Sequence, residues 1–228
     1  MPASDPGIRA RTVAFAALAF FIVGGLGRLA LGDALTSWDE RIILGVIGTQ
    51  RPAVAGWMSV LSAIGSGSVA IPAGVAIFIV LLLRRWRRTA LCYGVTVLSG
   101  WGLNALLKNG FRRIRPDLLP HLDGAGWYSY PSGHSMLAPL VFGLGAFLLT
   151  RGRPPLTRIP ARTAAILLCL AIAWSRVYLG VHYPSDVVGA LLAGTGWAAL
   201  GVAVYSPLDE FPSRVTLPPP SRSAPPAA

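Results

Sequence analysis

Long runs without charge are the feature that most constrains this chain. Between Arg51 and Arg84 there is no Asp, Glu, Lys or Arg, and several stretches approach the roughly 20 apolar residues needed to cross a bilayer. Only 13% of the 228 residues are charged, whereas an average soluble domain carries about 25%. A single large water-soluble core does not account for such runs. The sequence therefore predicts an all-α, polytopic membrane protein.

Six stretches are expected to cross the membrane as helices. Gly and Ser residues at 65–68 interrupt the long uncharged region, so residues 54–64 are interpreted as an interfacial or kinked lead-in, with Trp57 near the headgroups. Residues 32–51 are polar and mixed, and residues 109–134 are too rich in charge, Gly and Pro to span. The predicted crossings are residues 12–31, 67–83, 89–107, 135–150, 161–175 and 187–205.

The chain is expected to form one membrane domain, residues 13–205, between two polar ends. Residues 1–12 are interpreted as a cytoplasmic leader, although a basic segment before an apolar run is also the pattern of a signal peptide. Residues 206–228 are rich in Pro, Ser and Ala, a composition that favours a disordered cytoplasmic tail. Cys92 and Cys169 lie in apolar runs without a CxxC spacing, which indicates packing residues rather than a disulfide or a metal site.

Basic residues indicate which loops face the cytoplasm. The loops at 84–88 and 151–162 are short and rich in Arg, so the positive-inside rule places both inside. Single crossings then place residues 108–134 and 176–186 on the extracytoplasmic side. Twelve of the 20 basic residues fall inside, and the exceptions cluster around the outer polar segments. The net charge of +11 therefore indicates membrane topology and an anionic ligand rather than nucleic acid.

The first outer segment carries four cations near one membrane face. Lys108 is followed by Arg112, Arg113 and Arg115. A lysine supplies a point charge and an arginine a two-pronged donor, a combination suited to phosphate. A patch that binds anionic lipid headgroups without specificity has the same composition. The segment alone does not separate these interpretations.

A second polar motif, Pro131-Ser132-Gly133-His134, stands just before an apolar helix. Ser132 is a candidate N-cap, and the amides of Gly133 and His134 would then point out of the helix N-terminus, where anions bind readily. Gly133 also lets an oxyanion approach the backbone closely. A capped helix beside a boundary histidine is the alternative interpretation.

A third polar motif places Arg176, His182 and Asp186 between the last two apolar runs. Asp186 lies four residues beyond His182 and can reach its ring. A carboxylate on one ring nitrogen fixes the tautomer and leaves the other nitrogen free as a nucleophile or base. A structural His–Asp pair is the alternative. A metal site is disfavoured, because the surrounding arginines repel a cation and no Cys or Glu is near.

These motifs resemble those of the type 2 phosphatidic acid phosphatase family, which shares its core with vanadium haloperoxidases. The resemblance covers about a third of the chain. All motif positions are matched in order: Lys108, Arg115 and Pro116 in the first motif, Pro131, Ser132, Gly133 and His134 in the second, and Ser175, Arg176, His182 and Asp186 in the third.

The resemblance implies a bundle of six transmembrane helices with the active site near the extracytoplasmic surface, and no metal or other cofactor. It implies that His182 attacks phosphorus to give a phosphohistidine, while Asp186 orients the ring. His134 would protonate the leaving oxygen and later assist attack by water. The phosphate-binding residues that it implies are Lys108, Arg115, Ser132, Gly133 and Arg176.

The family's substrates are phosphate and diphosphate esters of lipids, including phosphatidate, phosphatidylglycerophosphate and polyprenyl diphosphates, and the motifs do not separate these. The expected protein is a multi-pass lipid phosphatase of the plasma membrane. A lipid phosphotransferase with the same site, a vanadate-dependent haloperoxidase and a non-enzymatic membrane scaffold are the alternatives. Arg112, Arg113 and His121 are not motif positions and are interpreted as headgroup or loop residues.

Single cysteines test the predicted topology. In a background without Cys92 and Cys169, Asp123→Cys should react with a membrane-impermeant maleimide in intact cells, because residues 108–134 are expected outside. Arg153→Cys should react only after the cells are permeabilised. Equal labelling at both positions contradicts the arrangement.

Overall fold

The structure, a computed structural model, describes residues 6–117 and 128–205. Within these ranges the chain forms helices, turns and loops and no β-strand, which confirms the predicted all-α fold. The predicted tail, residues 206–228, and His121 lie outside the described residues. The elements are α1 (Pro6–Leu29), α2 (Asp33–Ile47), α3 (Pro52–Gly65), α4 (Gly67–Leu83), α5 (Arg87–Phe111), α6 (Gly133–Ala138), the π-helical turn η1 (Pro139–Gly143), α7 (Leu144–Leu149), α8 (Pro155–Tyr178) and α9 (Pro184–Tyr205).

Several helices have the dimensions of membrane spans. In the described part of the chain α1, α5, α8 and α9 are each long and apolar enough to cross a bilayer. Helices α3 and α4 form a fifth candidate if the bent pair counts as one broken span. The continuous segment Gly133–Leu149 is apolar but shorter. These spans describe a multi-pass membrane protein with four or five candidate crossings.

The break between α3 and α4 falls at the predicted Gly/Ser interruption. Ser66 is extended, with φ −70° and ψ 157°, and the two helix axes differ by 49°. A Cβ atom on Gly65 would lie 2.4 Å from Ile172 Cγ2 and 3.4 Å from His134 Cβ, so only glycine allows this contact. The break therefore seats the end of α3 against α8 and the start of α6.

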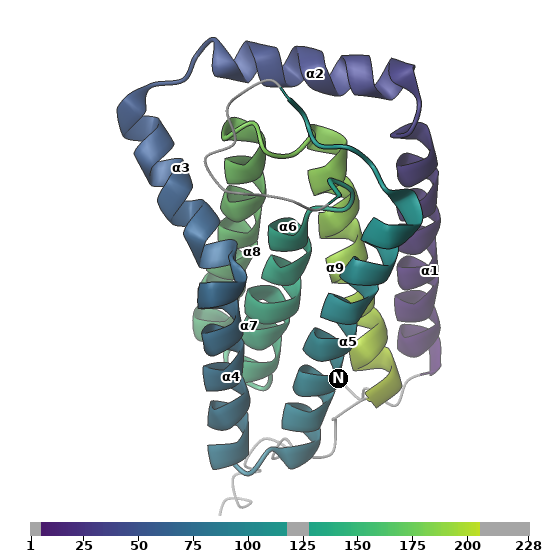
Figure 1. The fold of residues 1–228 in the computed structure, drawn as a ribbon. Coiled ribbons are helices and arrows are strands. Elements are labelled where there is room, and N and C mark those ends of the chain that lie inside the picture. The colour runs from purple at the N-terminus through teal and green to yellow at the C-terminus, as the bar shows by residue number, and fades with distance from the viewer. Residues whose placement is uncertain (1–5, 118–127, 206–228) are drawn as a thin grey trace, which may run out of the picture.

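The helices run alongside one another between two well-separated ends (Figure 1). The central helix is α9, which contacts α1, α5, α6, α8 and η1. The loops that join α4 to α5 and α7 to α8 lie at one end. At the other end α5 stops, α6 starts and α8 turns into α9, and α2 lies across the bundle there (Figure 1). Residues 33–47, which the sequence describes only as polar and mixed, are thus a helix that covers this end.

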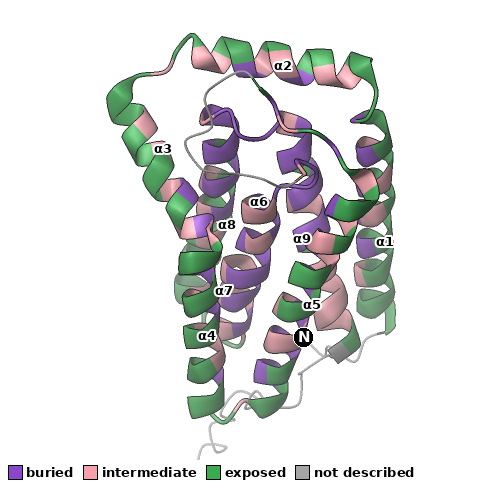
Figure 2. Cartoon of the chain, in the orientation of Figure 1, coloured by how far each residue is buried: buried purple, intermediate pink, exposed green. Residues whose placement is uncertain are grey.

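Burial follows the distribution expected for a protein in lipid. Figure 2 shows buried residues gathered in α6 to α9, whereas the outer faces of α1, α3 and α4 are exposed. Large apolar side chains occur on these outer faces, with Phe21 81% exposed and Leu83 78% exposed. A water-soluble protein rarely exposes extended apolar surface, whereas hydrocarbon tolerates it. The exposed apolar faces therefore support membrane insertion.

Helix α9 closely approaches the turn from α6 to η1. Pro139 has no backbone N–H to donate, and the helix widens into a π-helical turn from this residue. A Cβ atom on Gly194 would lie 2.6 Å from the Met136 carbonyl oxygen and 2.6 Å from Pro139 Cγ. Backbone and ring atoms cannot swing aside, so this position in α9 requires glycine.

A pair of glycine substitutions tests this close contact. We expect Gly194→Ala to lower the unfolding temperature of the detergent-solubilised protein, because overpacking a tight contact costs about 1–3 kcal/mol. Gly102→Ala on α5 is the matched control, since nothing lies within 4 Å of a Cβ there. Alanine favours a helix over glycine by about 1 kcal/mol, so the control should not be destabilised. Equal unfolding temperatures for the two variants contradict the contact.

Candidate active site

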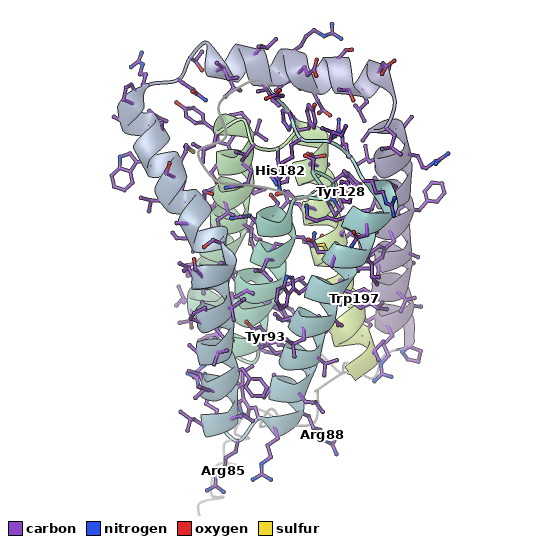
Figure 3. The ribbon with its side chains drawn as sticks, in the orientation of Figure 1. Arg85, Arg88, Tyr93, Tyr128, His182 and Trp197 are labelled. Atoms are coloured by element: carbon purple, nitrogen blue, oxygen red, sulfur yellow. The ribbon has the colours of Figure 1, made fainter. Side chains whose placement is uncertain are left out.

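The segments that carry the three motifs meet at one end of the bundle. Helix α5 ends there, α6 begins there, and the turn from α8 to α9 lies beside them (Figure 1). His182 and Tyr128 lie at this end, whereas Arg85 and Arg88 mark the opposite end (Figure 3). Charged motifs that are far apart in the sequence thus form one site, and the Arg-rich loop at 84–88 lies away from it.

His182 is 1% exposed and has different partners on its two ring nitrogens. Its Nδ1 lies 3.3 Å from Asp186 Oδ2, and its Nε2 lies 3.0 Å from Arg115 Nη1. A guanidinium can only donate, so Nε2 accepts from Arg115 and the ring proton belongs on Nδ1, facing the carboxylate. The sequence-based expectation that Asp186 reaches this ring holds in the structure. The Nε2 lone pair lies on the cationic side of the site.

The carboxylate of Asp186 is completely buried in the first turn of α9. Its Oδ2 accepts the backbone N–H of Tyr183 at 3.0 Å and the hydroxyl of Ser129. Its Oδ1 accepts Nη1 of Arg113 at 2.7 Å. A buried carboxylate is stable only when charge and hydrogen bonds compensate the lost water. These donors therefore hold Asp186 in one orientation toward His182.

Burial also sets the protonation state of His182. Removal of water lowers the pKa of His182 to about 3, since an imidazolium needs solvation that this site does not provide. Asp186 opposes this lowering, and the positive charges of Arg115 and Lys108 contribute to it. The ring is neutral in the pH range where histidine ordinarily titrates. A neutral ring keeps an unprotonated nitrogen, here Nε2, which is the form of histidine that can act as a nucleophile.

Three predicted phosphate ligands reach this end from different elements. Lys108 lies in the last turn of α5, Arg115 follows that helix, and Arg176 lies in the last turn of α8. Lys108 Nζ donates to the Tyr128 carbonyl at 2.6 Å, and Arg176 Nη1 donates to the Ser62 hydroxyl of α3. Lys108 is 6% exposed and Arg176 is 2% exposed. These contacts orient long cationic side chains that would otherwise be mobile.

The start of α6 brings the second motif to the same place. Ser132 occupies the predicted N-cap position, but its side chain makes no capping hydrogen bond to the helix backbone. Its hydroxyl instead accepts a hydrogen bond from Ser135 Oγ at 3.1 Å, and its amide donates to the Asp186 carbonyl at 3.2 Å. Gly133 follows as the first residue of α6. A Cβ atom added to it would lie 3.5 Å from Asn104 Oδ1. The second motif is therefore bonded directly to the first turn of α9.

His134 lies near the same cations as His182 but in a different setting. Arg176, Arg115 and Lys108 all act on His134 by Coulomb interaction. Its side chain packs near Gly65, at the break between α3 and α4. The two motif histidines thus approach one group of cations from separate elements.

An apolar cavity of about 400 Å³ begins at this second motif. Gly133, His134 and Asn104 line one end, and the cavity continues between α4, α5 and η1 to Phe78 and Tyr93. Its lining includes exposed apolar side chains that face outward from α4 and α5: Ile71, Val75, Leu98 and Trp101. The cavity thus joins the polar end of the bundle to its lipid-facing surface.

Arg113 corrects one expectation. It was interpreted as a headgroup or loop residue, but it is only 4% exposed and donates to Asp186, Ser185 and Asp39. The guanidinium is buried because two carboxylates surround it, and these attractions raise the pKa of Arg113 against the opposing effect of burial. Arg112, by contrast, is exposed at the C-terminus of α5.

Two further polar residues of the site were not predicted from the sequence. Ser129 bonds Asp186 and lies 3.3 Å from His182 Nδ1, and Asp39 bonds Arg113 from α2. Asp39 is 74 residues from its partner, so no local spacing reveals it. Ser129 lies just before the second motif, where a serine suggests only a turn.

Charge within the cluster around Asp186 and His182 favours a dianion. Four cations and two carboxylates lie together, which leaves a surplus of two positive charges, and a phosphate group carries about −1.5 to −2. The members are Lys108, Arg113, Arg115 and Arg176 with Asp39 and Asp186. Among the described residues no group of three or more His, Cys, Asp or Glu side chains could hold a metal ion.

Comparison with known proteins places this geometry in a family. The family model described as PAP2 superfamily matches residues 89–209, more than half of the chain. The chain belongs to the PAP2 superfamily. The type 2 phosphatidic acid phosphatase resemblance of the motifs is therefore confirmed, and the protein is an enzyme of the phosphatase class, a phosphoric ester hydrolase.

Individual PAP2 relatives resemble most of the chain. Phosphatidylglycerophosphatase B of Bacillus subtilis is 31% identical over 168 residues, which cover 71% of this chain and 80% of that protein. The undecaprenyl-diphosphatase of Sulfolobus acidocaldarius is 27% identical over 197 residues, which cover 83% of this chain and 89% of that protein. The crystal structure of a transmembrane PAP2-type phosphatidylglycerolphosphate phosphatase from Bacillus subtilis superimposes with a TM-score of 0.79 at 27% identity, over 86% of this chain and 98% of the other.

Proposed function

We propose that the protein is an integral membrane phosphatase that hydrolyses a phosphate or diphosphate monoester of a lipid. In this proposal the reaction proceeds through a phosphohistidine and needs no metal. The observation that carries the proposal is the arrangement at His182. Its Nδ1 faces the Asp186 carboxylate, and its Nε2 faces Arg115. A neutral imidazole is thereby presented with its lone pair toward the place where cations would hold a phosphate.

In the first step His182 Nε2 attacks phosphorus while the bond from phosphorus to the ester oxygen breaks. Lys108, Arg115 and Arg176 stabilise the negative charge on the phosphoryl oxygens, with help from Ser132 and Gly133. His134, protonated once the negatively charged phosphate is bound among the cations, gives a proton to the leaving oxygen. Asp186 keeps the ring in the reactive tautomer and stabilises the positive charge that develops on it. The products of the step are a lipid alcohol, or a lipid monophosphate from a diphosphate, and phosphohistidine.

In the second step water attacks the phosphohistidine. His134, now without its proton, accepts one from the water, and the bond between Nε2 and phosphorus breaks. Inorganic phosphate leaves and His182 returns to its neutral form. Each residue therefore finishes the cycle in the state in which it began it.

The cavity supports a lipid as substrate. From Asn104 to Tyr93 it follows about 16 Å of α5, taking the rise of an α-helix per residue. One leaflet contributes about 15 Å of a hydrocarbon core that is roughly 30 Å thick. An acyl or prenyl chain could therefore lie in the cavity along its leaflet while its phosphate lies among the cations. Phosphatidate, phosphatidylglycerophosphate and polyprenyl diphosphates all combine a long apolar chain with a phosphate group at one end.

The same proposal includes the orientation of the protein in the plasma membrane. The segment Gly133–Leu149 completes six crossings together with α1, the α3–α4 pair, α5, α8 and α9. Residues 13–205 form the membrane domain, and residues 1–12 and 206–228 are its cytoplasmic ends. The active site then faces the extracytoplasmic side. Supporting this orientation, the Arg-rich loop at 84–88 lies at the opposite end from His182 (Figure 3).

The proposed roles of the two histidines predict different responses to the leaving group. A lipid alkoxide leaves poorly and needs a proton, whereas a phenolate of an activated aryl phosphate does not. General acid catalysis contributes about 10²–10⁴-fold where it is needed. We expect His134→Ala to lose far more activity on a lipid phosphate than on an aryl phosphate. His182→Ala should lose nearly all activity on both substrates and any trappable phosphoenzyme.

The measurement compares kcat/KM for the two variants on the two substrates, with wild-type protein as the reference for each. Equal losses for His134→Ala on both substrates refute the general-acid role. An acid-labile, base-stable phosphoenzyme in His182→Ala shows that another residue is the nucleophile.

Filling the cavity tests the assignment of a lipid chain to it. A Cβ on Gly74 would lie 3.5 Å from Tyr93 Oη without a clash, so Gly74→Leu should place its side chain in the cavity. We expect this variant to lose kcat/KM on long-chain lipid phosphates and to retain it on a short water-soluble phosphate ester. Gly102→Leu on the exposed face of α5 is the control. A parallel loss on both substrates argues against the lipid-chain role.

A further inference from the structure

Asp39 connects a helix outside the family-model segment, residues 89–209, to the candidate active site. It lies in α2 and is only 2% exposed. Its Oδ2 accepts Arg113 Nη2 at 2.8 Å and the hydroxyl of Ser185, and its Oδ1 accepts the Ser185 backbone N–H at 3.0 Å. Burial of a carboxylate at this depth is costly, and all of these donors belong to residues beside the proposed catalytic pair.

Arg113 carries the contact from Asp39 onward to Asp186. Its Nη1 donates to Asp186 Oδ1 at 2.7 Å while its Nη2 binds Asp39. The guanidinium carbon lies 3.9 Å from the ring centre of Tyr183, so the plane is also held from one face. Because a guanidinium is rigid and planar, fixing one end by Asp39 orients the other end toward Asp186.

We propose that Asp39 is a positioning residue for the reaction, acting through Arg113 on Asp186 and His182. The inference rests on the proposed function, in which His182 is the nucleophile. Two carboxylates share one guanidinium in this arrangement, so each receives part of its positive charge. Asp39 thereby limits how strongly Arg113 neutralises Asp186 and keeps enough negative charge beside the Nδ1 proton to support attack by Nε2.

The variant Asp39→Asn keeps the shape of the side chain and removes its charge. All of the positive charge of Arg113 then acts on Asp186, and the ring of His182 becomes a weaker nucleophile. We expect the rate of phosphohistidine formation to fall by roughly 10–100-fold, by analogy with the loss seen when a residue that orients a metal-binding side chain is removed. KM should change little, because Asp39 contacts none of the proposed phosphate ligands. Asp39→Glu, which keeps the charge, should recover part of the rate.

Asp33→Asn is the matched control, since Asp33 lies exposed at the start of the same helix. It removes the same charge from α2 without touching Arg113. A second readout needs no turnover: the chain has three histidines, so nitrogen-15 histidine spectra of the full-length protein in detergent are simple to assign. We expect Asp39→Asn, but not Asp33→Asn, to shift the ring-nitrogen signals of His182.

The two readouts separate the failure of this inference from failure of the proposed function. If His182→Ala still turns over substrate, the proposed function is wrong whatever the Asp39 variants do. If His182→Ala is inactive but Asp39→Asn matches Asp33→Asn in both rate and spectrum, only the positioning role is wrong. A purely structural role predicts loss of folded protein with an unshifted His182 signal in what remains.

If Asp39→Asn fails to fold, a double variant can take its place in the test. Asp39→Asn with Arg113→Gln removes both charges together and avoids an uncompensated buried arginine. Loss of Arg113 removes a hydrogen bond that orients Asp186, so this double variant should fold, form phosphohistidine slowly and show a shifted His182 signal. It should match Arg113→Gln alone, because Asp39 acts only through Arg113. Wild-type signal and rate in the double variant overturn the proposal.

Discussion

A carboxylate that is shut away from water must obtain every hydrogen bond from the protein, and Asp186 is in that position. Its donors come from the segment after α5, the segment before α6 and the turn before α9. Helix α2 joins the same network through Asp39, the second carboxylate that binds Arg113. Charge and hydrogen bonding therefore link these segments at this end, and α2 adds apolar contacts through Ile43 and Ile47. At the opposite end, apolar side chains from α4, α5 and α7 pack around Leu81 and Tyr93 instead.

Local patterns in the sequence were sufficient for most helices. The predicted crossing 67–83 coincides with α4, and the interruption at 65–68 marks a real break. Membrane helices are easily predicted because apolar length is a local property. The number of crossings is harder to predict, since Gly133–Leu149 is shorter than the other spans and Pro139 alters its winding. Helix α1 begins at Pro6, before the apolar run, because basic residues do not prevent a helix from extending.

The motifs identified contacts between residues that are close in the sequence, such as His182 and Asp186. They did not reveal Asp39, because its partner Arg113 is remote in the chain and neither residue has a distinctive neighbour. Arg113 itself was hidden among adjacent cations, of which Arg112 is exposed and Arg113 is buried. Charge in a loop indicates that an anion is near, but only the folded chain shows whether that anion is a ligand or another side chain.

The cavity that leads from His134 to the outward-facing side chains of α4 and α5 has a kinetic consequence. A substrate that enters from the side never passes through water, so the quantity that governs its encounter with the enzyme is its mole fraction among neighbouring lipids. Adding inert detergent or phospholipid at constant total substrate would dilute that surface density and slow turnover. The apparent affinity of such an enzyme is therefore a property of the host membrane as much as of the binding site.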